Sequence, residues 1–211
     1  MKFYLIRHGE TEWNKLGRFQ GHTEVKLNER GLAQAKESAQ AAAQWGPSII
    51  YSSPLTRTMQ VAEEIGQVMS VAVVARPGLM ELMLGDLEGV TGDEMRKGWP
   101  DVFHTWRESP ESVKMPNGES LVQLQERAWE TVVAIEKDHG DDESIVVVSH
   151  NFAIRTVISA LVGIPLANFH RLSLGLGSVC VFESDRQGES DERARRLLTY
   201  NSTGHLSPEN R

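Results

Sequence analysis

The chain has 211 residues, of which 40% are apolar and 24% charged, and its formal net charge is −7. These values are typical of a globular protein with one sizeable core, and the acidic balance argues against a general nucleic-acid-binding protein. No apolar run approaches membrane-spanning length, and no signal peptide precedes the first predicted strand. We therefore expect a single domain over residues 1–211 in the cytoplasm, with no nucleic-acid or membrane partner.

A short apolar run over residues 3–6 opens the chain and predicts a buried strand. Arg7 and His8 follow it directly, and Gly9 takes the chain out of the sheet. Ligands of open α/β sheets bind at the carboxyl ends of the strands. An arginine offers a planar fork for phosphate oxygens, and a histidine offers a nitrogen nucleophile. Taken alone, this pair fits an ordinary polar strand end better than an active site.

Apolar runs and helix-type spacing alternate along the rest of the chain. Strands are predicted over residues 48–51, 71–74, 144–148, 172–174, 178–182 and 195–200. Helices are predicted over residues 28–43, 119–138 and 152–161, and another helix follows Ser53 as N-cap and Pro54 as its first residue. The alternation predicts an α/β fold, a three-layer α/β/α sandwich with a mainly parallel central sheet.

Three further candidate residues fall at the same predicted edge of the sheet. Arg57 lies in the first turn of a helix, where a cation opposes the helix dipole and is a candidate for anion binding. His150 follows the strand over residues 144–148 and repeats the placement of His8. Glu81 lies in a leucine-rich segment, and a carboxyl group in apolar surroundings holds its proton more readily, as a general acid must. Asp86 and Glu88 of that segment are interpreted as surface charges.

Two arginines and two histidines at one edge make a strong site for a tetrahedral anion such as phosphate. No acidic cluster accompanies them, and the histidine spacings typical of metal sites are absent, so we expect neither a metal nor another cofactor. Residues 90–117 are the least regular part of the chain, and we interpret them as a small helical insertion that forms a lid over this site.

The motif Arg7-His8-Gly9-Glu10-Thr11 resembles the signature of the histidine phosphatase superfamily, also called phosphoglycerate mutase-like. Later blocks match the family in the right order and extend the resemblance over nearly the whole chain: Phe19-Gln20-Gly21, Ser52-Ser53-Pro54-Leu55-x-Arg57-Thr58, Glu81 and Val148-Ser149-His150. The resemblance implies a phosphohistidine mechanism with His8 as the nucleophile. It further implies that phosphoryl oxygens are held by Arg7, Arg57 and His150, with Asn14 in support, and that Glu81 protonates the leaving oxygen. Asn151 stands where many relatives carry glycine.

Three functions fit this resemblance. The first is a metal-independent phosphomonoesterase that hydrolyses small phosphorylated metabolites. The second is a phosphoglycerate mutase, and the third is a non-catalytic protein that binds phosphate esters. The segment over residues 85–89 resembles the phosphatase branch, and the chain has no counterpart of the insertion that the mutases carry. The sequence leaves open whether the chain forms a homodimer.

The part of the substrate beyond the phosphate is expected to contact the first loop, through Arg18, Gln20, Gly21 and His22, together with Asn151. Residues 201–206 offer one more candidate, because Gly204 allows a turn that would bring His205 back over the sheet. A tail that frays after Leu206 is the simpler expectation, since chain ends are usually poorly ordered. This set suits a carboxylated substrate such as phosphoserine or a phosphoglycerate derivative. Residues 185–192 are predicted to be a polar hairpin tip.

Overall fold

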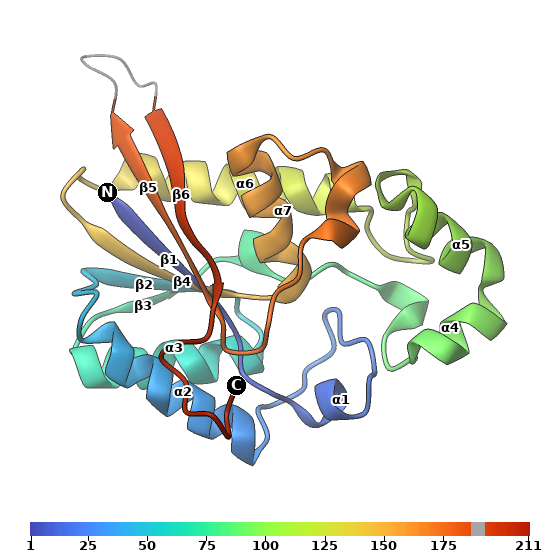
Figure 1. Ribbon diagram of the computed structural model, residues 1–211, viewed down its shortest axis with the longest axis horizontal. Coiled ribbons are helices and arrows are strands. Elements are labelled where there is room, and N and C mark those ends of the chain that lie inside the picture. Colours follow the sequence, from blue (N-terminus) through green and yellow to red (C-terminus); the bar gives the residue numbers. More distant parts are fainter. Residues whose placement is uncertain (187–192) are drawn as a thin grey trace.

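The computed structural model describes residues 1–186 and 193–211. Within these residues six strands form one sheet in the order β3-β2-β4-β1-β5-β6 (Figure 1). The strands are β1 (Lys2–Arg7), β2 (Ile49–Ser52), β3 (Val73–Ala75), β4 (Ser144–Ser149), β5 (Val179–Arg186) and β6 (Arg193–Ser202). The first four are mutually parallel, whereas β5 is antiparallel to both β1 and β6. Beyond residue 186, the expected hairpin tip lies outside the described residues.

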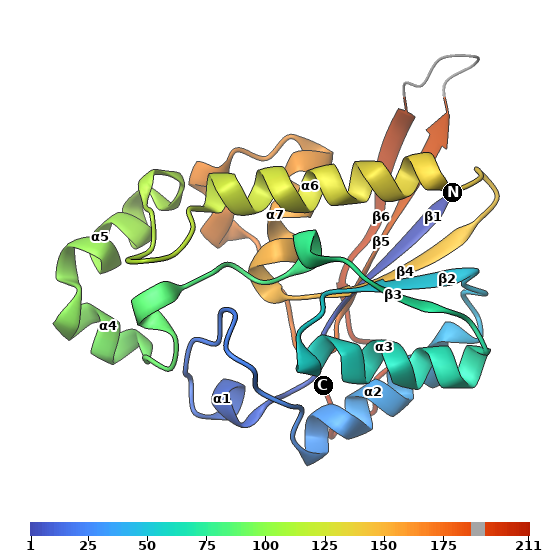
Figure 2. The same cartoon turned by 180° about the vertical axis from the view of Figure 1, so that it is seen from behind.

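Helices cover both faces of the sheet, as the alternation predicted (Figures 1 and 2). One face carries α2 (Glu29–Ala42) and α3 (Thr56–Met69), and the other carries α6 (Leu121–Asp138) and α7 (Asn151–Val162). Strand β4 shows why both faces are apolar. Its residues 145 and 147 pack towards α6 and α7, whereas 146 and 148 pack towards α2 and α3. The two-residue period of a strand thus builds two cores from one continuous apolar run. The predicted three-layer α/β/α fold is confirmed.

The segment over residues 90–117 folds into α4 (Gly92–Gly98), α5 (Pro100–Glu108) and the short 3-10 turn Pro110–Ser112. It has a hydrophobic cluster of its own, in which Met95, Val113 and Met115 pack on the first turns of α6 and on Leu82 and Leu87. Figure 1 shows α4 and α5 beside the sheet rather than on either of its faces. The expected helical insertion is therefore present, and its role as a lid stays a prediction.

Three local predictions were wrong. Helix α3 begins at Thr56 with Leu55 as its N-cap, and not with Ser53 as N-cap; the Ser53 hydroxyl lies 2.8 Å from a histidine ring and accepts only a long contact of 3.4 Å from the Leu55 N–H. The third strand covers Val73–Ala75 instead of residues 71–74, because Ser70 takes a left-handed conformation at φ 56° and the Val71 N–H turns back to α3. Residues 172–174 form no strand, since the Leu174 carbonyl accepts a hydrogen bond from a side chain of β1.

The tail does not fray after Leu206. It packs along α2, and Leu206 is only 2% exposed. Beyond it, the Ser207 N–H and the Asn210 amide both donate to the Glu37 carboxylate at 2.9 Å, and the Asn210 carbonyl accepts from Gln34. Both partner side chains belong to α2, so the end of the chain is fixed by a helix some 170 residues earlier in the sequence.

Because the tail is anchored by one buried apolar side chain, we expect Leu206→Ala to lower the free energy of unfolding by about 2–4 kcal/mol, the usual effect of emptying such a site. Leu198→Ala is the matched control, since Leu198 lies on β6 and is 47% exposed. It should change the free energy of unfolding by less than about 0.5 kcal/mol. Urea denaturation of both variants measures the difference, and equal effects would mean that the tail contributes nothing.

Candidate active site

The carboxyl ends of β1, β2 and β4 bring the predicted residues to one place. Arg7 ends β1 and His8 follows it, His150 follows β4, and Arg57 is the second residue of α3 after β2. The rings of His8 and His150 meet edge to face, with their centroids 5.3 Å apart. A cavity of about 240 Å³ opens here, lined by Arg7, His8, Asn14, Gly17, Arg18, Phe19, Gln20, Gly21, Arg57, Glu81, Leu84, Asn151 and Phe152.

The His8 ring is held in one orientation. Its Nδ1 lies 2.7 Å from the Gly9 carbonyl oxygen, and the ring is 3% exposed. A carbonyl oxygen can only accept, so Nδ1 carries the ring proton and Nε2 keeps its lone pair. Burial lowers the pKa of His8 well below its ordinary value, and the charges of Arg57 and Arg7 lower it further. His8 is therefore a neutral imidazole at neutral pH, which is the form that a nucleophile needs.

Two guanidinium groups provide the positive charge of the site. Arg57 is fully buried and donates to the carbonyls of Thr23 and Gly21 at 3.0 and 2.7 Å, and Arg7 donates to the Leu174 carbonyl at 2.5 Å. The Nε of each has no hydrogen-bond partner, and within the described residues neither pairs with a carboxylate. Burial lowers the pKa of both arginines to about 10, with Glu81 acting in the opposite direction, so both stay charged at neutral pH.

His150 is fully buried, and its Nε2 lies 2.8 Å from the Ser53 hydroxyl. Its Nδ1 has no partner among the residues that the structure describes. Burial lowers the pKa of His150 well below its ordinary value, and Arg57 and His8 contribute in the same direction. The ring is therefore neutral. Ser53, which the sequence suggested as a helix cap, orients this ring instead.

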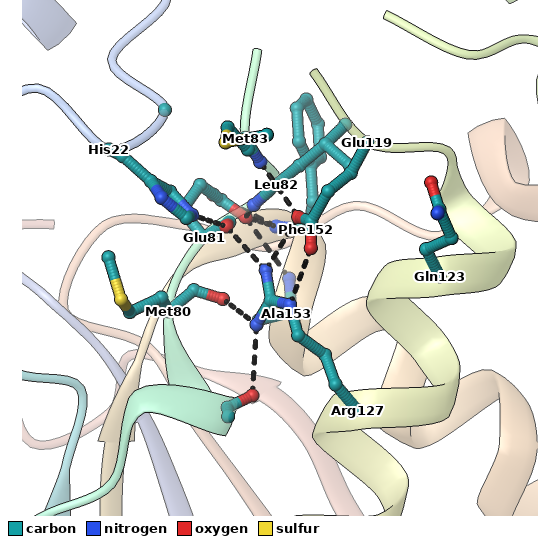
Figure 3. Close-up of polar contacts among 12 residues, drawn as sticks. His22, Met80, Glu81, Leu82, Met83, Glu119, Gln123, Arg127, Phe152 and Ala153 are labelled. Carbon is teal, nitrogen blue, oxygen red and sulfur yellow. Dashed lines mark hydrogen bonds and ion pairs between the residues drawn. The ribbon is translucent and has the colours of Figure 1, made fainter. Parts of the chain in front are cut away.

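The Glu81 carboxylate lies at the N-terminus of α7 (Figure 3). Its Oε1 accepts from the main-chain N–H groups of Leu82, Phe152 and Ala153 at 2.9, 3.1 and 3.2 Å. Glu81 is 7% exposed and lines the cavity. The first N–H groups of a helix have no partner within the helix, so they are available to a carboxylate placed there. The sequence predicted apolar surroundings for Glu81, and the structure adds three main-chain N–H groups that donate to its carboxylate.

The loop residues predicted to bind substrate divide into two groups. Asn14, Arg18, Gln20, Gly21 and Asn151 line the cavity, and the buried Gln20 Oε1 has no hydrogen-bond partner in the described part of the chain. The Arg18 guanidinium donates to the Gly89 carbonyl, and its Nη1 lies 3.5 Å from the Glu94 carboxylate.

His22 and His205 do not line the cavity. The His22 Nε2 lies 2.8 Å from the Glu81 carbonyl oxygen, behind the carboxylate (Figure 3). The His205 Nε2 lies 3.2 Å from the Ser38 hydroxyl of α2, and its ring packs on Trp45. The expected return of His205 over the sheet edge is therefore wrong, because the tail follows α2 instead.

Glu88 was interpreted as a surface charge, but its carboxylate accepts from the His22 N–H at 2.8 Å and from the Thr23 hydroxyl at 2.5 Å. It thus fixes the turn whose carbonyls accept from Arg57. Gly21 in this turn has φ +52°, and a Cβ there would lie 2.2 Å from the Glu88 carboxylate. The close approach therefore requires glycine. No sequence periodicity marks Glu88. Its supporting role is visible only in the structure, where its loop contacts the loop that contains His22 and Thr23.

Two further observations concern the described residues as a whole. Over residues 1–186 and 193–211, no three His, Cys, Asp or Glu side chains gather in a group that could hold a metal ion. In the same residues, no helix has both the length and the apolar character needed to cross a membrane.

Comparisons with known proteins agree with this geometry. The model of the histidine phosphatase superfamily (branch 1) matches residues 3–195. Phosphoserine phosphatase 1 of Hydrogenobacter thermophilus is 34% identical over 98% of this chain and 94% of its own length. A probable phosphoglycerate mutase of Escherichia fergusonii is 32% identical over 82% of this chain and 80% of its own length. A mycobacterial glucosyl-3-phosphoglycerate phosphatase, solved with VO3, has a TM-score of 0.86 at 27% identity, covering 96% and 99% of the two chains.

The chain belongs to the histidine phosphatase superfamily, and it is a phosphatase, as the sequence resemblance predicted.

The lowered pKa values of His8 and His150 predict a pH-dependent stability. Below about pH 6.5, the ordinary pKa of histidine, the unfolded chain binds protons that the folded chain does not, so the free energy of unfolding falls as the pH is lowered. We expect His8→Asn to reduce the slope of this fall between about pH 6.5 and 5. His104→Asn changes an exposed histidine and should keep the wild-type slope. Denaturant titrations in phosphate-free buffers test this, and equal slopes in all three proteins would contradict it.

Proposed function

We propose that the protein is a metal-independent phosphomonoesterase of small phosphorylated metabolites that works through phosphohistidine at His8. One observation carries the proposal: the free Nε2 of a neutral His8 lies in a cavity that it shares with the buried Arg57 and the half-buried Arg7, and within the described residues neither guanidinium group pairs with a carboxylate. Such cations stabilise the charge on the equatorial oxygens of a phosphoryl group in transfer.

In the first step, the His8 Nε2 attacks phosphorus, and a nitrogen–phosphorus bond forms as the ester oxygen leaves. The leaving oxygen takes the proton of the Glu81 carboxyl group. In the second step, a water molecule gives a proton to the Glu81 carboxylate and attacks the phosphohistidine. The nitrogen–phosphorus bond breaks, and its electron pair returns to Nε2. Arg7, Arg57 and His150 hold the phosphoryl oxygens throughout, so that one difficult displacement becomes two easier ones.

We further propose that the substrate carries a carboxylate near its phosphate. Arg18 supports this, because it is a cation on the wall of the same cavity, and its side chain is 39% exposed. The names of the relatives from Hydrogenobacter and mycobacteria denote phosphoserine and glucosyl-3-phosphoglycerate, which are both carboxylated esters. His205 has no part in this proposal.

The mechanism predicts inorganic phosphate release in the presence of a strong chelator and a trapped phosphoryl group on the His8 Nε2. His8→Ala should fold normally and lose turnover by at least about a thousandfold, the scale expected when a covalent nucleophile is removed. Release of phosphate and mass spectrometry of the acid-sensitive adduct are the measurements.

The same assay separates hydrolysis from the mutase alternative, to which the Escherichia relative points. We expect free phosphate from 3-phosphoglycerate to exceed interconversion with 2-phosphoglycerate, even with bisphosphoglycerate present. Rapid interconversion with little free phosphate would make the mutase alternative correct. Phosphate on another residue, or loss of activity with the chelator, would reject the mechanism.

The carboxylate proposal predicts a selective effect of Arg18→Met. Its KM for phosphoserine should rise about tenfold, since one charged hydrogen-bonded contact is lost, while p-nitrophenyl phosphate should change by less than about twofold. Lys15→Met removes a nearby exposed cation that does not line the cavity and serves as the control. Equal effects of Arg18→Met on the two esters would exclude a role of Arg18 in carboxylate recognition.

A further inference from the structure

Arg127 of α6 lies behind the segment that carries Glu81, outside the lining of the cavity (Figure 3). Its guanidinium group makes five hydrogen bonds. Nε and Nη2 donate to the two oxygens of Glu119, each at 2.8 Å. Nη1 donates to the carbonyls of Gly78 and Met80 at 3.0 and 2.8 Å, and Nη2 donates to the Glu81 carbonyl at 2.7 Å. Every donor of an arginine side chain is thus in use.

Glu119 completes the arrangement from the other side. Its carboxylate accepts from the Met83 N–H at 2.9 Å, and its own main-chain N–H donates to the Met83 carbonyl at the same distance. Burial acts to raise the pKa of Glu119, but the hydrogen bonds from Arg127 and Met83 outweigh it, and its pKa lies below the ordinary value. Glu119 is therefore charged and forms an ion pair with Arg127.

The segment held in this way has no regular structure of its own. It runs between the 3-10 turns Pro77–Leu79 and Gly85–Leu87, and none of its residues belongs to the sheet. Buried main-chain carbonyls need donors, and a strand or helix would supply them. Here the carbonyls of residues 78, 80 and 81 all accept from Arg127, and the Glu81 carbonyl also lies 2.8 Å from the His22 Nε2. The segment also packs tightly on α6, since a Cβ at Gly78 would lie 1.9 Å from the Thr131 hydroxyl.

We propose that Arg127, with Glu119, is the positioning residue of the general acid. By fixing the main chain at Glu81, it places the carboxyl group between the α7 N-terminus and the ester oxygen. The inference rests on the proposed role of Glu81. It goes beyond that role, because Arg127 contacts neither the Glu81 carboxylate nor the cavity. Its contribution is geometric: a displaced acid no longer reaches the leaving oxygen.

The test compares two kinds of ester. An alkyl ester has a poor leaving group and depends on protonation, whereas p-nitrophenyl phosphate depends on it little. For Arg127→Met we expect kcat/KM to fall about 10–100-fold on the alkyl ester, the scale at which supporting residues affect a site, and less than about threefold on p-nitrophenyl phosphate. The alkyl ester is whichever of phosphoserine, 3-phosphoglycerate and glycerol 2-phosphate the wild type hydrolyses fastest. The loss should lie in kcat and not in KM.

Two further variants separate positioning from general damage. Arg127→Lys should not restore the alkyl-ester activity, because an ammonium group cannot reach three carbonyls and a carboxylate in a planar fork. Glu119→Gln removes one charged acceptor, leaves Arg127 in place, and should give a smaller loss with the same preference for the alkyl ester.

A double variant provides the strictest test. In a Glu81→Gln background the acid is already absent, so adding Arg127→Met should lower alkyl-ester turnover by less than about twofold more. Arg195→Met is the matched control. Arg195 of β6 makes a similar bidentate ion pair with Glu136, which lies on α6, the helix that also carries Arg127. This variant should lower thermal stability without changing the ratio of the two activities.

Two results would overturn the positioning role. One is an equal loss of activity on both esters in Arg127→Met, and the other is a loss from Arg127→Met that is as large in the Glu81→Gln background as in the wild type. Phosphohistidine trapping on the wild type reports separately on the proposed mechanism. A wild type that forms no phosphohistidine rejects that mechanism, and a wild type that forms it while Arg127→Met keeps the alkyl-ester rate rejects only this inference.

Discussion

The site depends on two guanidinium groups, those of the buried Arg57 and the half-buried Arg7, which form no ion pair with a carboxylate among the described residues. Arg57 is completely buried and donates to the carbonyl oxygens of Gly21 and Thr23, and the carboxylates of Glu81, Glu24 and Glu88 act on its charge without forming an ion pair with it in the described residues. Removing a cation from water costs free energy that neutral dipoles offset only in part. Under the proposed function a phosphoryl dianion supplies the missing charge, so the cost of burial favours anion binding. Burial and the same two cations together keep His8 neutral, and under the proposed mechanism this couples binding of the ester to activation of the nucleophile.

The sheet places the cations and histidines, but side chains from distant elements place the loops between them. Glu88 fixes the turn whose carbonyls accept from Arg57, and Arg127 fixes the segment that carries Glu81. In both cases a charged side chain pairs with main-chain groups of an irregular loop. Such a loop lacks the regular main-chain hydrogen bonds of a strand or helix. A polar side chain therefore has to bond the N–H and carbonyl groups of its main chain. Precision at the cavity therefore depends on residues that do not line it.

The agreement between the predicted and observed elements follows from the strength of the local signal. Strand β4 and helix α6 were located to within two residues, because a continuous apolar run and a helical stripe each have a definite period. The strand over residues 172–174 was predicted from apolar content alone. In the structure the Leu174 carbonyl accepts a hydrogen bond from the Arg7 side chain, and these residues form no strand. The short helix α1 (Glu12–Lys15) was not predicted, since four residues carry no period.

The sequence by itself determined the chemistry at the strand ends, namely Arg7, His8, Arg57 and His150. An apolar run that stops at a polar residue marks the end of a strand, and parallel strands end at one edge, so these four residues could be brought together without coordinates. Only the tertiary structure decided the rest: that Glu81 meets the α7 N-terminus, that Glu88 and Arg127 support the loops, and that His205 lies on α2. Those contacts join irregular segments far apart in the chain, where no periodicity constrains the partner and packing alone selects it.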